Sequence, residues 1–126
     1  MTEASFRACR LYKVLGNPLR YKILQDLAGS PMTPTNLALR THRSLSAVSR
    51  SLSLLHWPGL VWYQTCGHHI VYGLRHDDLA GFLADGEEFA ERHHLQVPPP
   101  PTDLSCRSPE DPYWLGPGAV PRIHAP

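Results

Sequence analysis

Apolar side chains recur every three or four residues in several segments of the chain, which is the spacing of one face of an α-helix. The pattern predicts a helix from Glu3 to Leu15, a second from Pro18 to Gly29 and a short third after the cap Thr33. A fourth begins at Ser44 and is broken by Pro58-Gly59. A last helix begins near residue 77 and ends about residue 94, with Leu79, Phe82, Leu83 and Phe89 as its apolar positions.

Two aromatic-rich runs between the fourth and last helices have the character of β-strands. They span residues 60–65 and 69–74, and Gly67 supplies a permissive turn between them, so an antiparallel hairpin is predicted. Thr41-His42-Arg43 forms a tight polar turn between the third and fourth helices. The expected fold is mainly α with a small β-hairpin, a winged helix-turn-helix with the order α-α-α-α-β-β-α.

The fourth helix has the composition of a DNA-reading helix. Leu45, Val48, Leu52 and Leu55 form one apolar stripe at helical spacing, and the outward positions are Ser46, Ala47, Ser49, Arg50 and Ser53. A helix that only closed a core would usually carry long charged residues outside. Small hydroxyl side chains can approach base edges closely, and Arg50 can fork onto guanine. We therefore predict DNA contact for Ser46, Ser49 and Arg50, whereas Ser44 fits an N-cap.

Three segments resemble the arsenic-repressor-like (ArsR/SmtB) winged-helix regulators. They are residues 15–24 (LGNPLRYKIL), residues 44–50 (SLSAVSR), and Gly59-Leu60-Val61 with the wing end Val71-Tyr72-Gly73-Leu74. The resemblance covers about residues 5–95, with the motifs in the family's order and spacing. It implies a bacterial or archaeal transcription factor, dimeric through its first and last helices, that an inducer releases from DNA.

The chain departs from the family pattern at three places. Ser51 stands where the family often has His, and Pro58 precedes the wing glycine. His68 and His69 occupy the wing where Arg or Lys is usual, so the wing contacts are expected to be weak or to strengthen on protonation.

Charge is divided unevenly along the chain. The formal net charge of the 126 residues is +1, but residues 1–75 hold nine Lys and Arg against two acids, and the remainder is acidic. A basic half that contains the reading helix suits phosphate binding, for which Arg40, Arg43 and Arg50 are the best placed. No apolar run is long enough to span a membrane and no signal-peptide pattern opens the chain, so we expect a cytoplasmic protein.

Residues 96–126 differ in composition from the rest. They contain nine of the thirteen prolines and little apolar periodicity. We expect one domain for DNA binding and dimerisation over residues 1–95 and a Pro-rich tail over 96–126. Either the tail is disordered or Tyr113 and Trp114 dock on the domain or the dimer partner.

The inducer site is not evident from the residues. Residues 32–40, where some family members hold metal with a cysteine pair, contain no Cys or His, and the Asp/His pattern of the last helix is missing. Glu91, His93 and His94 are the remaining candidate ligands for a metal ion or an arsenical. Cys9, Cys66 and Cys106 are the only thiols, and three scattered cysteines favour a reducing compartment over a disulfide framework.

The function predicted from these observations is a sequence-specific, homodimeric transcriptional repressor that reads an inverted-repeat operator in double-stranded DNA through Ser46, Ser49 and Arg50. The wider set of candidate DNA-binding residues also includes Arg40, Arg43, Ser44, Ala47, Ser53, His68 and His69. Two alternatives stay open: a metal- or thiol-responsive sensor of the same family, and a winged-helix protein-interaction module without DNA binding. No enzyme is expected, because a wing tip offers Cys66 and its histidines no pocket, orienting group or oxyanion donors.

Overall fold

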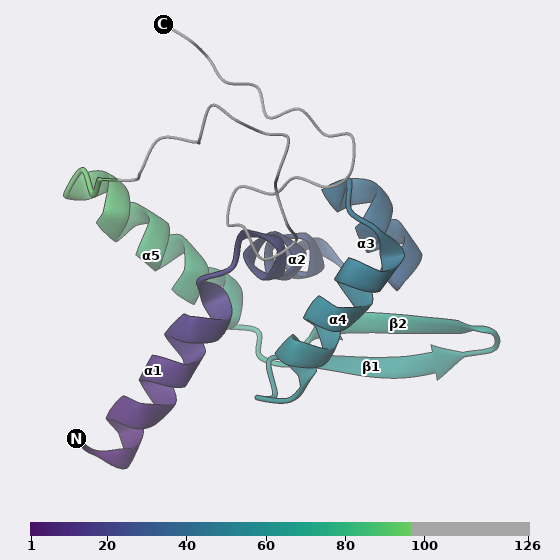
Figure 1. Ribbon diagram of the computed structural model, residues 1–126, viewed down its shortest axis with the longest axis horizontal. Helices are drawn as coiled ribbons and strands as arrows, with labels where there is room; N and C mark the ends of the chain where they lie inside the picture. The colour runs from purple at the N-terminus through teal and green to yellow at the C-terminus, as the bar shows by residue number, and fades with distance from the viewer. Residues whose placement is uncertain (97–126) are drawn as a thin grey trace, which may run out of the picture.

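Five helices and a two-stranded antiparallel sheet make up residues 1–96, which are the residues that the computed structural model describes (Figure 1). The helices are α1 (Glu3–Leu15), α2 (Pro18–Gly29), α3 (Pro34–Thr41), α4 (Leu45–His56) and α5 (Leu79–Arg92); the strands are β1 (Val61–Cys66) and β2 (His69–Leu74). The predicted fold class and element order are confirmed. The proposed tail, with Cys106, Tyr113 and Trp114, lies outside the described residues.

Side-chain caps fix where the first four helices begin. Thr2, Asn17, Thr33 and Ser44 each accept a hydrogen bond from a backbone N–H of the first turn, which would otherwise lack a partner. Proline occupies the first position of both α2 and α3, where its missing N–H costs nothing. These starts agree with the predicted ones.

The last helix is shorter than predicted. Asp78 makes no capping hydrogen bond through its side chain, and α5 begins at Leu79, two residues after the expected start. The helix ends at Arg92 rather than about His94, since His94 adopts a left-handed backbone conformation with φ of 49°. The predicted first strand is also shifted by one residue, to Val61–Cys66.

The core lies around α2, which contacts each of the other helices and β2. Its members are apolar residues from α2, α3, α4, α5, the first residue of β1 and the residue before it: Leu19, Ile23, Leu24, Leu27, Leu37, Val48, Leu52, Leu55, Leu60, Val61, Leu79 and Leu83. The expected core stripe of α4 is confirmed for Val48, Leu52 and Leu55, which are completely buried. It is wrong for Leu45, the first residue of α4, which is 51% exposed.

A single residue outside the hairpin pairs with β2, and the sequence pattern did not predict this pairing. Met32 forms an isolated antiparallel bridge with Tyr72, with both backbone N–H···O=C bonds made at 2.8 and 2.9 Å. The bridge ties the segment before α3 to the wing. Within the hairpin Trp62 is paired with Gly73, and a Cβ atom on Gly73 would lie 2.3 Å from the Trp62 ring. Glycine therefore leaves the space that the indole fills.

Figure 1 shows that the hairpin projects from one side of the domain, whereas α1 and α5 lie on the other. Helix α2 lies between these two sides, and the helix-turn-helix of α3 and α4 lies on the side of the wing. None of the helices within residues 1–96 is long and apolar enough to cross a membrane.

Candidate nucleic-acid interface

The turn between α3 and α4 is built on a left-handed residue. His42 has φ of 56° and ψ of 39° and ends α3, with its backbone N–H bonded to the carbonyl of Ala38. The N–H of Arg43 donates to the same carbonyl at 3.2 Å. The expected tight turn is confirmed at His42 and Arg43, whereas Thr41, also expected in the turn, is the last residue of α3.

The outer face of α4 is formed by short polar side chains and one arginine. Ser46, Ser49, Arg50 and Ser53 are all exposed, as predicted. Ala47 is an exception, because it is half-buried and packs against the core. With the small serines, this face lets another molecule approach the helix backbone closely.

Ser44 is occupied by the helix end. Its hydroxyl accepts a hydrogen bond from the N–H of Ala47 at 3.1 Å and lies 3.5 Å from the Ser46 hydroxyl. The N-cap interpretation of Ser44 is confirmed. Its oxygen already has a donor, so contact with DNA would have to use its remaining lone pair or its proton.

The two arginines before α4 lie in different surroundings. The Arg43 side chain is buried, with 9% of the residue exposed, and burial lowers the pKa of its guanidinium. An arginine in that position belongs to the interior of the helix-turn-helix, so we leave Arg43 out of the proposed contact surface. Arg40 is half-exposed and remains within it.

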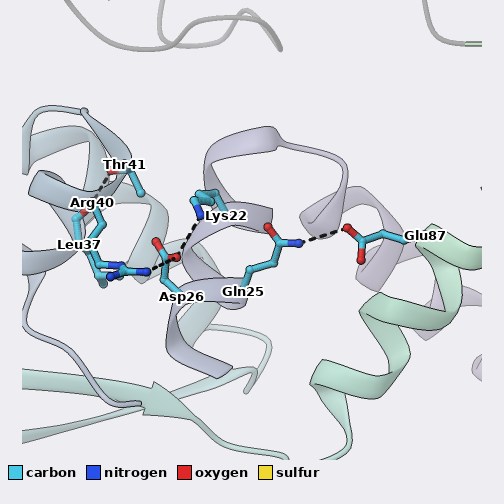
Figure 2. Close-up of polar contacts among 7 residues, drawn as sticks. All are labelled: Lys22, Gln25, Asp26, Leu37, Arg40, Thr41 and Glu87. Atoms are coloured by element: carbon cyan, nitrogen blue, oxygen red, sulfur yellow. Dashed lines mark hydrogen bonds and ion pairs between the residues drawn. The ribbon is translucent and has the colours of Figure 1, made fainter. Parts of the chain in front are cut away.

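A buried carboxylate holds Arg40 (Figure 2). Only 3% of the Asp26 side chain is exposed, and its Oδ1 lies 3.4 Å from Arg40 Nη2 and 3.2 Å from Lys22 Nζ. Asp26 Oδ2 is buried without a hydrogen-bond partner. Because Asp26 belongs to α2 and Arg40 to α3, the ion pair links the core helix to the helix-turn-helix. Sequence reasoning missed this role, since an Asp within an apolar stripe gives no sign of its partner.

The wing tip carries the predicted histidines in the open. His68 and His69 are exposed on the turn, where Gly67 has φ of 63°, and Cys66 is paired with His69 across the hairpin. Cys66 is a free, exposed thiol. The turn therefore presents imidazoles and a thiol but no lysine or arginine.

Aromatic rings support the wing at its base. Tyr63 packs against His56 at 5.0 Å and against Tyr72 at 5.8 Å, measured between ring centroids. Burial and the neighbouring Tyr63 raise the pKa of Tyr72 above its ordinary value, so the phenol stays neutral at physiological pH. These contacts join the end of α4 to both strands.

On the side away from the wing, α1 and α5 form an apolar groove of about 720 Å³. The rings of Tyr12 and Phe82 lie along it with centroids 6.2 Å apart, and Phe89 lines it further along α5. The Tyr21 hydroxyl donates to the carbonyl of Leu83 at 3.2 Å and so joins α2 to α5. Phe82 and Phe89 remain exposed, so no other part of residues 1–96 covers the groove.

Comparison with known proteins gives structural matches but no match to a family model or to a curated protein sequence. The solution structure of apo-NmtR matches with 31% sequence identity and a TM-score of 0.63, covering 79% of this chain and 85% of that one. The homodimeric winged helix-turn-helix DNA-binding domain of Mb0332 from Mycobacterium bovis, an ArsR-family candidate, matches with 26% identity and a TM-score of 0.65, covering 75% and 91%. HlyU from Vibrio cholerae matches with 27% identity and a TM-score of 0.62, covering 76% and 100%.

The chain belongs to the ArsR/SmtB family. Its structural neighbours are winged helix-turn-helix transcriptional regulators rather than enzymes. The resemblance read from the three sequence segments is therefore confirmed.

One departure from the ArsR/SmtB pattern now has a structural setting. Ser51, which stands where the family often has His, is buried in α4 beside Leu52. Ser51 is only 7% exposed, so the change alters the inner face of α4 rather than its outer face.

The candidate metal ligands of this ArsR/SmtB chain do not form a cluster within the described residues. Glu91 is in the last turn of α5, and His93 and His94 follow it, all three exposed. The His93 ring instead packs on Phe89, with centroids 4.7 Å apart. Across residues 1–96 no three His, Cys, Asp or Glu side chains come together as metal ligands would.

Proposed function

We propose that the protein is a sequence-specific DNA-binding transcriptional repressor that acts as a homodimer on an inverted repeat. The observation that carries the proposal is the outer face of α4, where exposed serines flank the single Arg50 next to a β-wing. A reading helix enters the major groove with its N-terminal residues toward the base edges. Ser46, Ser49 and Arg50 are then the base-reading residues, with Ser53 beyond them.

Contacts to the DNA backbone are assigned to the flanks of α4. Arg40 provides a half-exposed guanidinium on α3, and the exposed His68 and His69 reach the neighbouring groove from the wing.

Dimerisation is assigned to α1 and α5. An uncovered apolar groove with exposed aromatic rings is a surface that a second copy would bury. A two-fold dimer of this kind places two reading helices about 34–36 Å apart, which is one turn of DNA, and so calls for an inverted repeat.

A mobility-shift assay on the region upstream of the protein's own operon tests the proposal. We expect a shifted complex that is competed by the same duplex and not by an equal mass of random duplex. Repeating the titration at two salt concentrations separates phosphate attraction, which weakens with salt, from the base-reading preference. Equal affinity for the two duplexes at every salt concentration would argue against sequence-specific regulation.

Release by thiol chemistry is a second candidate, favoured by the exposure of Cys9 and Cys66 as free thiols. It is tested by comparing operator affinity of the wild type and a triple Cys→Ser variant, including Cys106, under reductant, mild oxidant, arsenite and zinc. A response lost in the triple variant supports the thiol route. Zinc release that survives in it points to Glu91, His93 and His94 instead.

The remaining alternative is a protein-interaction module that does not bind DNA. The wing turn without lysine or arginine and the single arginine of α4 favour it. It predicts no shifted complex with any duplex, even at low salt, where the non-specific attraction of a basic surface is strongest.

A further inference from the structure

Leu45 is exposed, although its spacing along α4 places it in register with the buried apolar residues of that helix. Val48, Leu52 and Leu55 on the same helix are completely buried, whereas half of Leu45 faces solvent. Single exposed leucines are common in folded proteins and by themselves indicate nothing. The position of this one is what matters, because Leu45 is the first residue of α4.

The side chain of Leu45 lies beside the proposed reading residues. At 3.6 residues per turn, Ser49 follows Leu45 by about 40° around the helix axis, and Ser46 follows it by about 100°. The hydroxyl of Ser44, on the other side of Leu45 along the chain, is engaged in the helix cap. On this first turn the accessible groups are thus one hydroxyl and one apolar side chain.

Among the atoms that a base pair presents in the major groove, the C5-methyl group of thymine is the apolar one. Polar base edges would lose hydration against a leucine without gaining a hydrogen bond, and that loss is unfavourable. We propose that Leu45 contacts a thymine methyl group and thereby specifies thymine at one position of each half-site. The inference rests on the proposed DNA-binding function and adds a residue that selects one base.

The test removes the methyl group from the DNA and the side chain from the protein. A preferred duplex is first selected from a random-sequence pool, and each of its thymines is then replaced in turn by deoxyuridine, which pairs with adenine but lacks the methyl group. Affinities are measured by fluorescence anisotropy for the wild type and for Leu45→Ala. Burying about one methyl-sized group against leucine predicts that the wild type loses about fourfold in affinity at one thymine position of each half-site.

Leu45→Ala should bind the thymine and deoxyuridine duplexes equally at that position. Leu54→Ala is the matched control, because Leu54 is on the same helix with nearly the same exposure, 48% against 51%. Nine residues separate the two, which puts their side chains on opposite sides of the helix. Leu54→Ala should therefore retain the wild-type preference for thymine.

The outcomes separate the two proposals. A protein that binds selected duplexes but tolerates deoxyuridine at every position overturns the role of Leu45 and leaves DNA binding intact. The same holds if Leu45→Ala keeps the full thymine preference. Failure to enrich any duplex from the pool overturns the proposed function and the Leu45 inference together.

Discussion

The three arginines of the helix-turn-helix differ in how much of each side chain is exposed and in whether it is paired with an acid. Arg50 is exposed and makes no ion pair among the described residues. Arg40 is tied to Asp26, and Arg43 is buried. Arg40 can therefore contact DNA only through the exposed half of its side chain, and Arg43 is left out of the proposed contact surface.

Arg50→Ala should cost about 1–3 kcal/mol of binding free energy at the preferred site and relax the base preference there, because a bidentate contact to guanine is lost. Arg40→Ala should weaken preferred and random duplexes alike, since a phosphate contact carries no sequence information. Anisotropy titrations on both duplexes measure the two effects. Equal losses on preferred and random duplexes for Arg50→Ala would remove its base-reading role.

Asp26 predicts an asymmetry in folding stability. Asp26→Asn frees Lys22 and Arg40, which are both half-exposed and can be solvated, so we expect a loss of about 1 kcal/mol or less in the free energy of unfolding. Replacing both Lys22 and Arg40 by Met leaves the buried carboxylate without a cation, and that should cost several kcal/mol, on the order of 3–5.

Urea denaturation of the two variants measures the asymmetry, with Arg7→Met as a control that removes an exposed arginine paired only with exposed Glu3. The account of Asp26 fails if the double Met variant is as stable as the Asn variant.

At the scale of elements, the packing of the wing depends on the Trp62 ring lying over Gly73 of the opposite strand. Gly73 in β2 is buried and leaves room for the Trp62 ring opposite. Gly73→Ala should displace the indole and destabilise the fold by about 1–3 kcal/mol, as overpacking does. Gly81→Ala in α5 is the control, because a Cβ there meets nothing within 4 Å and the helix gains about 0.5–1 kcal/mol. Thermal unfolding of both variants should give melting temperatures shifted in opposite directions.

The helices were predictable because their signals are local. The signals that mark each boundary lie within one helical turn of it. They are capping residues such as Thr33 and Ser44, prolines at the first helical position, and the spacing of apolar residues. The Met32 bridge was not predictable, since a single residue paired across forty positions has no periodicity. The start of α5 was predicted two residues too early, because the acidic residues at 77 and 78 suggested the first turn of a helix. In the structure Asp78 precedes the helix as its N-cap, and its side chain makes no capping hydrogen bond.

The candidate site was also predictable only where the signal lies within a single helix. The exposure of Ser46, Ser49 and Arg50 could be inferred from helical spacing alone. The burial of Arg43, the ion pair of Asp26 and the exposure of Leu45 depend on where α2 and α3 lie relative to α4. Such distances between helices are set by packing, which no single-helix pattern contains.

At the scale of the whole molecule, the proposed DNA-contacting surface and the proposed dimer surface are formed by different elements. The proposed DNA contacts come from α3, α4 and the wing, whereas the aromatic groove is lined by α1, α2 and α5 (Figure 1). Placing the two functions on separate surfaces lets a second copy cover the groove without covering α4. It also allows each surface to be altered alone.

Phe82→Glu should convert the protein from a dimer to a monomer. The ring is exposed in the single chain, stacks near Tyr12, and would be desolvated by a partner, so a charge there opposes association. Light scattering at micromolar concentration measures the mass, with Leu54→Glu as the control because that exposed leucine lies on α4, away from the groove. We expect the wild type and the control to be dimers of about twice the 14.1 kDa chain mass.

Loss of the dimer should also reduce operator affinity, because one half-site then binds without the second. When two DNA-binding subunits are joined in a dimer, binding of the first raises the effective concentration of the second at the neighbouring half-site. This gain in operator affinity is lost when the subunits separate. The Phe82→Glu monomer should therefore bind a single half-site as well as the wild-type subunit does, but gain little from a second half-site one DNA turn away. A wild-type monomer in solution, or a variant that keeps the full advantage of the inverted repeat, would contradict dimerisation through α1 and α5.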